Sequence, residues 1–180
     1  MIREYMGQCV SLRPVALDDA SFIVELRNTP NNALFINETS TDVLQQIDWM
    51  NNEFKDTTSF YFIILNIKEK PIGTISLYNV CNSSGEFGRW VCNGSSLESL
   101  ESALLIHQYA FMVLGLHKVY SRTLESNSKV VSFHRNFGAS VSSKPYFEPE
   151  YGQNVFKGTV DNVMFPGILA RCKKMIGSLL

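Results

Sequence analysis

The amino-acid sequence predicts a single mixed α/β domain over residues 1–180, with a central, mostly antiparallel sheet of about seven strands and about four helices. Two observations lead to this prediction. Three apolar segments joined by turn residues lie between positions 59 and 92. After position 94 the hydrophobic period changes from two residues to about 3.6, and strand-like segments return later in the chain.

The N-terminal part is predicted to hold one strand and two helices. Apolar and polar residues alternate over 9–15, which is typical of a half-buried strand. Two aspartates at 18–19 offer an N-cap for a helix that ends near position 28. A second helix is expected to begin near Ser40 or Thr41. Its predicted inner face consists of Val43, Leu44, Ile47 and Met50.

Three strands and a long helix follow. The strands are predicted at 59–67, 72–80 and 86–92, and their short connections are typical of an antiparallel meander. The first of these runs is almost continuously apolar, as a strand buried on both faces would be. Ser95 and Glu98 have the S-x-x-E spacing of a capping box, which predicts the start of the long helix.

The C-terminal part is predicted to add a strand at 118–124, a helix capped by Asn127, and two last strands near 139–143 and 157–169. A strand that follows a long helix requires a crossover connection, which favours one parallel pair. The sheet is therefore expected to be mixed.

Composition excludes several classes of function. Lys and Arg total 16 against 17 Asp and Glu, so a nucleic-acid partner is not expected. No apolar run approaches the roughly 20 residues that cross a bilayer, and the first residues lack a secretion signal, so we expect no membrane partner and a cytoplasmic location. The four cysteines form no C-x-x-C pair and there are three histidines, so no metal site is predicted.

Three stretches carry a resemblance to a known family. They are SLRPVALDDASFIVELRN (11–28), GEFGRWV (85–91) and YAFMVLGLHKVYSRTLESNSKVVSFHRNFGA (109–139). Together they resemble the GNAT superfamily of acyl-CoA N-acyltransferases, in the branch of the ribosomal-protein alanine acetyltransferases and some amino-sugar acetyltransferases. The resemblance implies the GNAT fold, with the fourth and fifth strands splayed apart, and acetyl-CoA as the cosubstrate.

The resemblance also implies where CoA binds. The pantetheine arm enters the gap between the strands at 86–92 and 118–124, and the pyrophosphate meets the N-terminus of the long helix, where N–H groups and the helix dipole favour an anion. The cofactor-binding residues predicted in this way are Trp90, Val91, Cys92, Ser95, Ser96, Glu98, Ser99, Leu100, Asn127 and Lys129.

The pyrophosphate loop departs from the family pattern Arg/Gln-x-x-Gly-x-Gly/Ala. The matching stretch, 95–100, has no basic residue, and Glu98 adds a negative charge. Serine hydroxyls and backbone N–H groups can still donate, and Lys129 offers a compensating charge. There are two alternatives to CoA binding at this stretch. Ser95 and Glu98 could form a capping box with only a structural role, or the protein could be a binding module that has lost catalysis.

His134 stands where the family often has a tyrosine that protonates the departing thiolate, and a histidine with its ordinary pKa near 6.5 could do this. Glu86 matches a general base of some members. Both residues also have structural interpretations, as a cap histidine and a strand-end carboxylate. Arg27, Asn28 and Tyr78 are predicted to contact the acceptor.

The expected reaction is acetyl transfer from acetyl-CoA to a primary amine by direct attack in a ternary complex. The favoured acceptor is an amino sugar, including a nucleotide-linked one, and the alternative is a protein N-terminal amine. Homodimers are frequent among such proteins, and an exposed edge strand could mediate one here.

Overall fold

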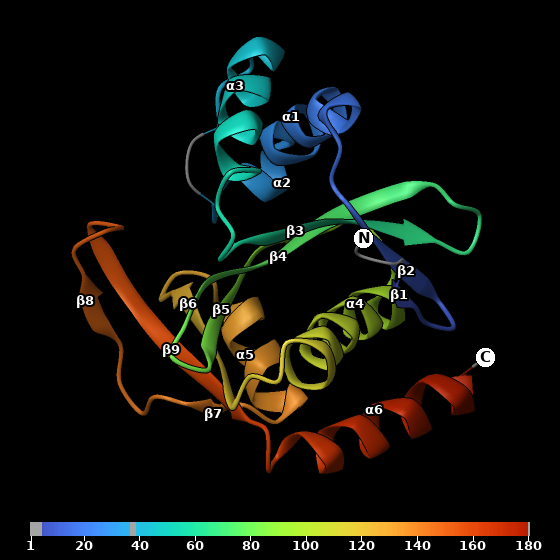
Figure 1. Ribbon diagram of the computed structural model, residues 1–180. Coiled ribbons are helices and arrows are strands. Elements are labelled where there is room, and N and C mark those ends of the chain that lie inside the picture. Colours follow the sequence, from blue (N-terminus) through green and yellow to red (C-terminus); the bar gives the residue numbers. More distant parts are fainter. Residues whose placement is uncertain (1–4, 37–38, 180) are drawn as a thin grey trace.

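The computed structural model describes residues 5–36 and 39–179 (Figure 1). The strands are β1 (Tyr5–Met6), β2 (Val10–Pro14), β3 (Phe60–Asn66), β4 (Pro71–Cys81), β5 (Ser84–Cys92), β6 (Lys118–Leu124), β7 (Ser140–Val141), β8 (Tyr146–Glu148) and β9 (Gln153–Asp161). The helices are η1 (Leu17–Asp19), α1 (Ala20–Asn28), α2 (Pro30–Ala33), α3 (Val43–Glu53), α4 (Ser96–Gln108), the π-helical turn η2 (Tyr109–Val113), α5 (Ser128–Phe137) and α6 (Phe165–Leu179).

The strands form one mixed sheet in the order β1-β2-β3-β4-β5-β6-β9-β7, with β8 also paired to β9. The pair β5–β6 is parallel, and the other pairs among the described strands are antiparallel. The parallel pairing is short, since it joins 84–86 to 118–120 and then stops, although both strands continue. The predicted fold class and the splay between these two strands are therefore confirmed.

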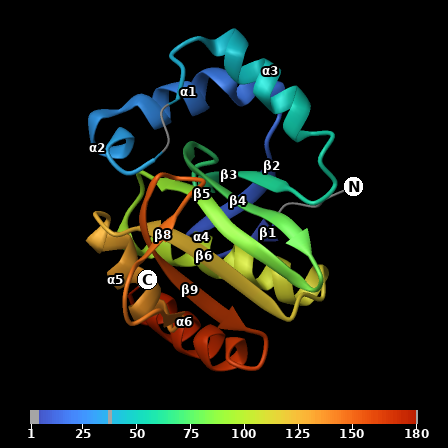
Figure 2. The ribbon, with the colours of Figure 1, turned by 90° about the vertical axis from the view of Figure 1, so that its left-hand side faces the viewer.

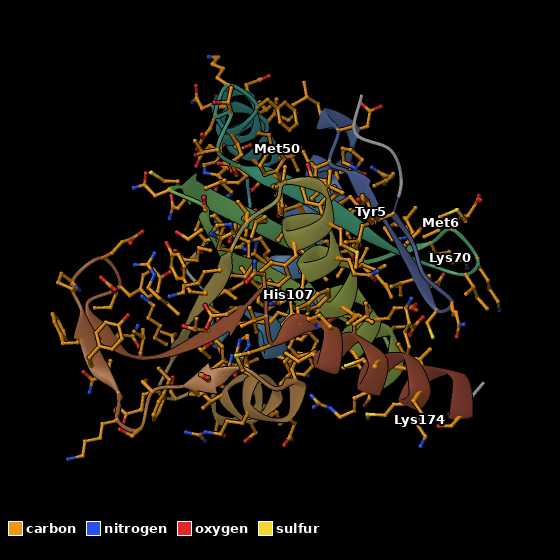
Figure 3. The ribbon with its side chains drawn as sticks, turned by 60° about the horizontal axis from the view of Figure 1, so that its bottom comes forward. Tyr5, Met6, Met50, Lys70, His107 and Lys174 are labelled. Carbon is orange, nitrogen blue, oxygen red and sulfur yellow. The ribbon has the colours of Figure 1, made fainter. Side chains whose placement is uncertain are left out.

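Helices cover both faces of the sheet. Helices α1, α2 and α3 lie on one side, and α4, α5 and α6 lie on the other (Figures 1 and 2). The strand β3 explains this arrangement, because its side chains alternate between two apolar clusters. Phe62 and Ile64 join the large core on the α4 side, whereas Tyr61, Ile63 and Leu65 pack under α1 and α3. Figure 3 labels Met50 on α3, which belongs to this second cluster, and His107 on α4 in the interior.

The C-terminal segment differs from the prediction. The strand expected at 157–169 ends at Asp161, and α6 begins at Phe165. The buried side chains of α6 recur at helical spacing, at Phe165, Ile168, Cys172 and Ile176, and they complete the core beside α4. The prediction was wrong because a short apolar run does not distinguish a buried strand from a buried helix.

Three smaller differences concern helix α3 and the short elements. Helix α3 begins at Val43 rather than near Ser40, because the carboxylate of Asp42 caps it by accepting the N–H of Leu44 at 2.8 Å. Leu44 was predicted to face inward but is 70% exposed. The short elements β1, β8 and α2 were not predicted. Each spans four residues or fewer, which is too short for a periodic pattern.

Candidate functional site

A cavity of about 160 Å³ lies where β5 and β6 diverge, and we call it the strand-splay cavity. Its walls come from the unpaired halves of the two strands, together with α5, the start of the β8–β9 hairpin loop and the segment after α2. The lining residues are Arg27, Phe35, Ile36, Tyr78, Phe87, Gly88, Arg89, Trp90, Ser121, Arg122, Thr123, Leu124, Asn127, Val130, His134 and Tyr151.

A second cavity, of about 530 Å³, lies between the N-termini of α4 and α5, and we call it the α4–α5 cavity. It is lined by Asn31, Asn32, Phe35, Ile36, Trp90, Val91, Cys92, Gly94, Ser96, Ser99, Asn127, Lys129, Val130 and Phe133. Because Phe35, Trp90 and Val130 line both this cavity and the strand-splay cavity, the two adjoin.

A third cavity, of about 370 Å³, lies on the opposite side of the strand-splay cavity, and we call it the α1–α3 cavity. Its lining residues are Arg27, Thr39, Ser40, Gln45, Gln46, Trp49, Tyr61 and Arg89. Arg27 and Arg89 also line the strand-splay cavity. The strand-splay cavity therefore joins a large cleft at two helix N-termini to a polar compartment beneath α3.

A β-bulge in β5 shapes the junction. Thr74 of β4 faces Val91 and Ser76 faces Gly88, so Arg89 and Trp90 together oppose the single residue Ile75. Arg89 has a φ of +48°, a conformation that is uncommon for residues with a side chain. Such an arrangement takes backbone groups out of the ladder and redirects the side chain. The bulge therefore turns Arg89 towards the cavities.

The guanidinium of Arg89 is held on several sides. It lies 5.0 Å from the ring centroid of Trp49 and 4.4 Å from that of Tyr78. Its Nη1 pairs with the carboxylate of Glu53 and lies 3.4 Å from the hydroxyl of Ser59. Two aromatic rings and an ion pair thus fix a cation at the boundary of two cavities.

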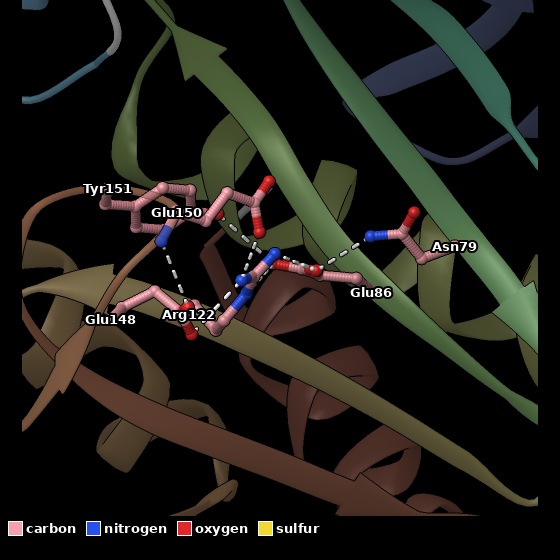
Figure 4. A network of polar contacts seen from close by, with 6 residues as sticks. All are labelled: Asn79, Glu86, Arg122, Glu148, Glu150 and Tyr151. Carbon is pink, nitrogen blue, oxygen red and sulfur yellow. Dashed lines mark hydrogen bonds and ion pairs between the residues drawn. The ribbon is translucent and has the colours of Figure 1, made fainter.

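A second arginine bridges the splayed strands (Figure 4). Arg122 of β6 donates from Nε and Nη2 to the two carboxylate oxygens of Glu86 on β5, both at 2.8 Å. Its Nη1 contacts Glu150 at 2.6 Å and Glu148 at 3.2 Å in the β8–β9 hairpin. The guanidinium also lies 4.8 Å from the ring centroid of Tyr151. Arg122 therefore connects β5, β6 and the hairpin below the strand-splay cavity.

The carboxylate of Glu86 accepts hydrogen bonds from several neighbouring side chains. It is 1% exposed and receives two bonds from Arg122, one from Asn79 at 3.2 Å and one from Tyr151 at 3.5 Å. A carboxylate offers about four lone-pair sites, so these donors occupy its capacity. The base role for Glu86 stays a prediction, and this contact set favours a holding role instead.

Burial and the Glu86 charge perturb the neighbouring groups. Hydrogen bonding to Glu86 raises the pKa of Arg122 further above its ordinary value. Burial, together with the Glu86 charge, raises the pKa of Tyr151 to about 12, and it also raises the pKa of Tyr78. Both phenols are therefore neutral near pH 7 and carry an O–H donor at the cavity wall.

His134 lies on α5 at the inner wall of the strand-splay cavity and is 5% exposed. Burial lowers the pKa of His134 to about 4, with a smaller effect of nearby His107. Its ring packs edge-on against Phe87, with the centroids 5.6 Å apart. At pH 7 this imidazole is neutral, so it does not retain the near-neutral pKa that the acid prediction assumed.

The N-terminus of α4 has the predicted capping box. The hydroxyl of Ser95 accepts the N–H of Glu98 at 3.2 Å, and the Glu98 carboxylate accepts the N–H of Ser95 at 2.6 Å. The N–H groups of the first helical turn have no intrahelical acceptor. Those of Ser96 and Leu97 have no other acceptor among the described residues either. They remain available to an anion at the α4–α5 cavity.

Only some of the predicted site residues line a cavity. The α4–α5 cavity brings together Trp90, Val91, Cys92, Ser96, Ser99, Asn127 and Lys129, but Ser95, Glu98 and Leu100 do not line it. Burial raises the pKa of the Cys92 thiol. Arg27 and Tyr78 line the strand-splay cavity. Asn28 lines none of the three cavities and donates its amide N–H to the carbonyl of Val24 at 2.9 Å.

Sequence reasoning missed Arg89, Arg122 and Tyr151. Arg89 had a detectable signal, because it is a charged residue in a strand otherwise rich in apolar and aromatic side chains. Arg122 and Tyr151 had none, since their importance comes from partners far away in the chain. Among the described residues, no cluster of His, Cys, Asp and Glu could hold a metal ion, and no helix is long and apolar enough to cross a bilayer.

The sheet topology, the splay between β5 and β6 and the cleft at the α4 N-terminus are together typical of GNAT acyltransferases. Residues 10–140 match the family described as the acetyltransferase (GNAT) domain. The chain belongs to the GNAT acetyltransferase family. No match was found among curated protein sequences.

Solved structures are similar over most of the chain. Apo FdhC, described as a nucleotide-linked sugar GNAT, has 27% identity and a TM-score of 0.76 over 93% of this chain and 94% of its own. Spermidine N-acetyltransferase from Vibrio cholerae, in complex with CoA and spermine, has 20% identity and a TM-score of 0.76, over 89% and 99%. A GCN5-related N-acetyltransferase from Brucella melitensis has 15% identity and a TM-score of 0.82, over 97% and 85%.

Proposed function

We propose that this protein transfers an acetyl group from acetyl-CoA to the primary amine of a nucleotide-linked amino sugar. The observation that carries the proposal is the arginine-lined passage through these connected cavities. Arg27 and Arg89 line both the strand-splay cavity and the α1–α3 cavity, and no carboxylate lines any of the three cavities among the described residues. Arg122 also lines the strand-splay cavity, but its charge is paired with Glu86, Glu148 and Glu150. An acceptor that carries negative charge suits this passage.

The α4–α5 cavity suits the cosubstrate. The N–H groups of Ser96 and Leu97 and the ammonium of Lys129 can hold the pyrophosphate, while the pantetheine arm runs along Trp90, Val91 and Cys92. The thioester then reaches the strand-splay cavity, which adjoins this cleft at Trp90.

The chemistry follows from this arrangement. The neutral amine attacks the thioester carbonyl carbon, the C–S bond breaks, and the proton lost from nitrogen balances the one gained by the thiolate. The bulge at Arg89 and Trp90 offers a backbone N–H for the developing oxyanion. The N–H of the neutral His134 ring is suited to a hydrogen bond with the departing sulfur. The Tyr151 hydroxyl lies on the same wall and becomes a second donor if it leaves its 3.5 Å contact with Glu86.

The charge of the cavities discriminates between acceptor classes. A polyamine carries several positive charges and would need carboxylates near the junction, whereas the described lining residues supply arginines. FdhC, a nucleotide-linked sugar GNAT, has higher identity to this chain than the spermidine N-acetyltransferase in complex with spermine. The charge of the cavity lining and the higher identity to FdhC both support an anionic acceptor.

The test has two stages. Acetyl-CoA is first titrated into the purified protein by calorimetry, and the acetylation of amino sugars, nucleotide-linked amino sugars, spermidine and N-terminal peptides is then measured by thiol release. We expect micromolar binding and a preference for the nucleotide-linked sugars. Absence of binding at about millimolar acetyl-CoA would leave a GNAT-fold binding module, and a preference for spermidine would overturn the acceptor assignment.

Replacing Glu98 by Gln is expected to tighten acetyl-CoA binding about two- to fivefold, the effect of one charge at a helix N-terminus. Glutamine can still accept the N–H of Ser95, so the cap persists while its negative charge disappears. Calorimetry measures the change, and Glu25→Gln on the exposed face of α1 is the matched control. Weaker binding in Glu98→Gln would show that the carboxylate is needed at this terminus.

Replacing His134 by Phe is expected to lower kcat about 10- to 100-fold while the KM for acetyl-CoA changes little, because the hydrogen bond to sulfur forms as the thiolate leaves. His134→Gln retains an N–H donor and should recover part of the loss. Steady-state kinetics with the preferred acceptor measure both. An unchanged kcat in His134→Phe, with a large loss in Tyr151→Phe, would transfer this role to Tyr151.

A further inference from the structure

The α1–α3 cavity adds space beyond what the reacting amine and thioester occupy. With a volume of about 370 Å³, it exceeds the strand-splay cavity, which it adjoins at Arg27 and Arg89. The amine of a large acceptor can reach the strand-splay cavity only if the rest of the molecule occupies a neighbouring space. The α4–α5 cavity is assigned to CoA, so the α1–α3 cavity is the compartment that remains.

The lining of this compartment is cationic and polar. Two arginines and four uncharged polar side chains, Thr39, Ser40, Gln45 and Gln46, line it, and no carboxylate does among the described residues. Glu53, which pairs with Arg89, lines a different cavity with Phe54 and Ser59. Burial lowers the pKa of Arg27, and repulsion from the nearby Arg89 guanidinium lowers it further. An anion between them would relieve that repulsion.

Arg89 is positioned before any ligand binds. Its backbone has a φ of +48° in the β5 bulge, and its guanidinium lies beside the rings of Trp49 and Tyr78. The ion pair with Glu53 uses Nη1, while Nε and Nη2 have no hydrogen-bond partner among the described residues. These two donors form a planar fork of the kind that binds a phosphate in two places.

An aromatic surface completes the compartment. Trp49 on α3 lines it and is 39% exposed, and its ring meets Tyr61 edge-on at a centroid distance of 5.9 Å. An indole that is partly exposed beside a fixed guanidinium offers a flat face to a nucleobase and a cation to its phosphates.

We propose that the α1–α3 cavity binds the nucleoside diphosphate part of the acceptor, with Arg89 and Arg27 at the phosphates and Trp49 against the base. The role of this site in catalysis rests on the proposed function. The binding itself does not, because it can be measured without acetyl transfer.

The experiment titrates uridine diphosphate and thymidine diphosphate into the full-length protein by calorimetry after saturation with CoA. Saturation matters because CoA carries its own nucleotide and fills the α4–α5 cavity. We expect at least one of the two to bind, with an affinity at least about tenfold weaker in Arg89→Gln and severalfold weaker in Trp49→Ala. Arg89→Lys keeps the charge without the fork and should be intermediate. Arg135→Gln, an exposed arginine of α5, should bind as the wild type does.

Folding of each variant is checked by thermal unfolding, and Trp49→Ala keeps the test valid if Arg89→Gln does not fold. No binding of either diphosphate to the wild type at about 10 mM, or equal binding by Arg89→Gln, would overturn the proposal. Equal binding of inorganic pyrophosphate would overturn the contact between Trp49 and a base. Acetyl transfer to a nucleotide-linked amino sugar without diphosphate binding removes this inference alone, whereas diphosphate binding without acetyl-CoA binding removes the proposed function alone.

Discussion

Acidification from about pH 7 to pH 4.5 is expected to remove several kcal/mol from the free energy of unfolding, because two buried histidines must gain protons when the chain unfolds. His107 is 2% exposed and His134 is 5% exposed. Burial lowers the pKa of each to about 4, and proximity to His107 adds to the shift of His134. Phe87, Phe137 and Phe165 surround the His107 ring, with centroids 4.9–6.2 Å away, so a charge on this ring would have little solvation.

Each histidine has a lower pKa in the folded protein than in the unfolded chain, where it is about 6.5. The stability linked to each is complete above about pH 6.5 and is lost as the pH falls towards 4. A depression of about 2.5 pH units corresponds to about 3 kcal/mol for each group, at 1.36 kcal/mol per unit.

Urea unfolding at several pH values measures this dependence. The variant His107→Leu, close in volume and without a titrating group, should lose about half of the pH dependence between pH 7 and 4.5. His117→Gln, at the exposed third histidine, is the control substitution. An unchanged pH dependence in His107→Leu would contradict the assignment.

Replacing Arg122 by Met is expected to destabilise the protein by about 3–5 kcal/mol, since it leaves the buried carboxylate of Glu86 without its cation. Arg122 supplies two of the four donors to Glu86 and also holds Glu148 and Glu150 of the hairpin. The hairpin carries Tyr151, so acetyl transfer should fall together with stability.

A double-mutant cycle identifies the cause. Glu86→Met combined with Arg122→Met removes both charges and should recover at least half of the lost stability, because the fully buried Glu86 charge disappears together with its partner. Glu150→Gln should cost less than about 1 kcal/mol, since its side chain is 63% exposed. The urea midpoint of each variant, at an unchanged m-value, measures the change in its free energy of unfolding. A loss below about 1 kcal/mol in Arg122→Met would show that water replaces the guanidinium around Glu86.

Several elements could be predicted from the sequence because their causes are local. The capping box of Ser95 and Glu98 and the cap of Asn127, which accepts the N–H of Val130 at 3.2 Å, join residues three positions apart. The continuous apolar run of β3 likewise reflects burial on both faces. The resemblance to GNAT proteins then added the splay between β5 and β6, which no local pattern encodes.

The site itself depended on contacts between distant residues. Glu86 and Arg122 are 36 positions apart and meet because β5 and β6 pair in parallel over three residues before they diverge. The bulge at Arg89 exists because β4 and β5 shift register opposite Ile75. His134 resembled an acid with an ordinary pKa, but packing against Phe87 removes it from water and keeps it neutral.

By itself, the sequence determined the order of most elements and the caps, because hydrophobic period and capping bonds act within a few residues, and its resemblance to GNAT proteins indicated the family. Only the tertiary structure decided which charges are paired, which histidines are neutral and which arginines face a cavity. Burial and ion pairing depend on strand register and helix packing, and those energies exist only once residues far apart in the chain are in contact.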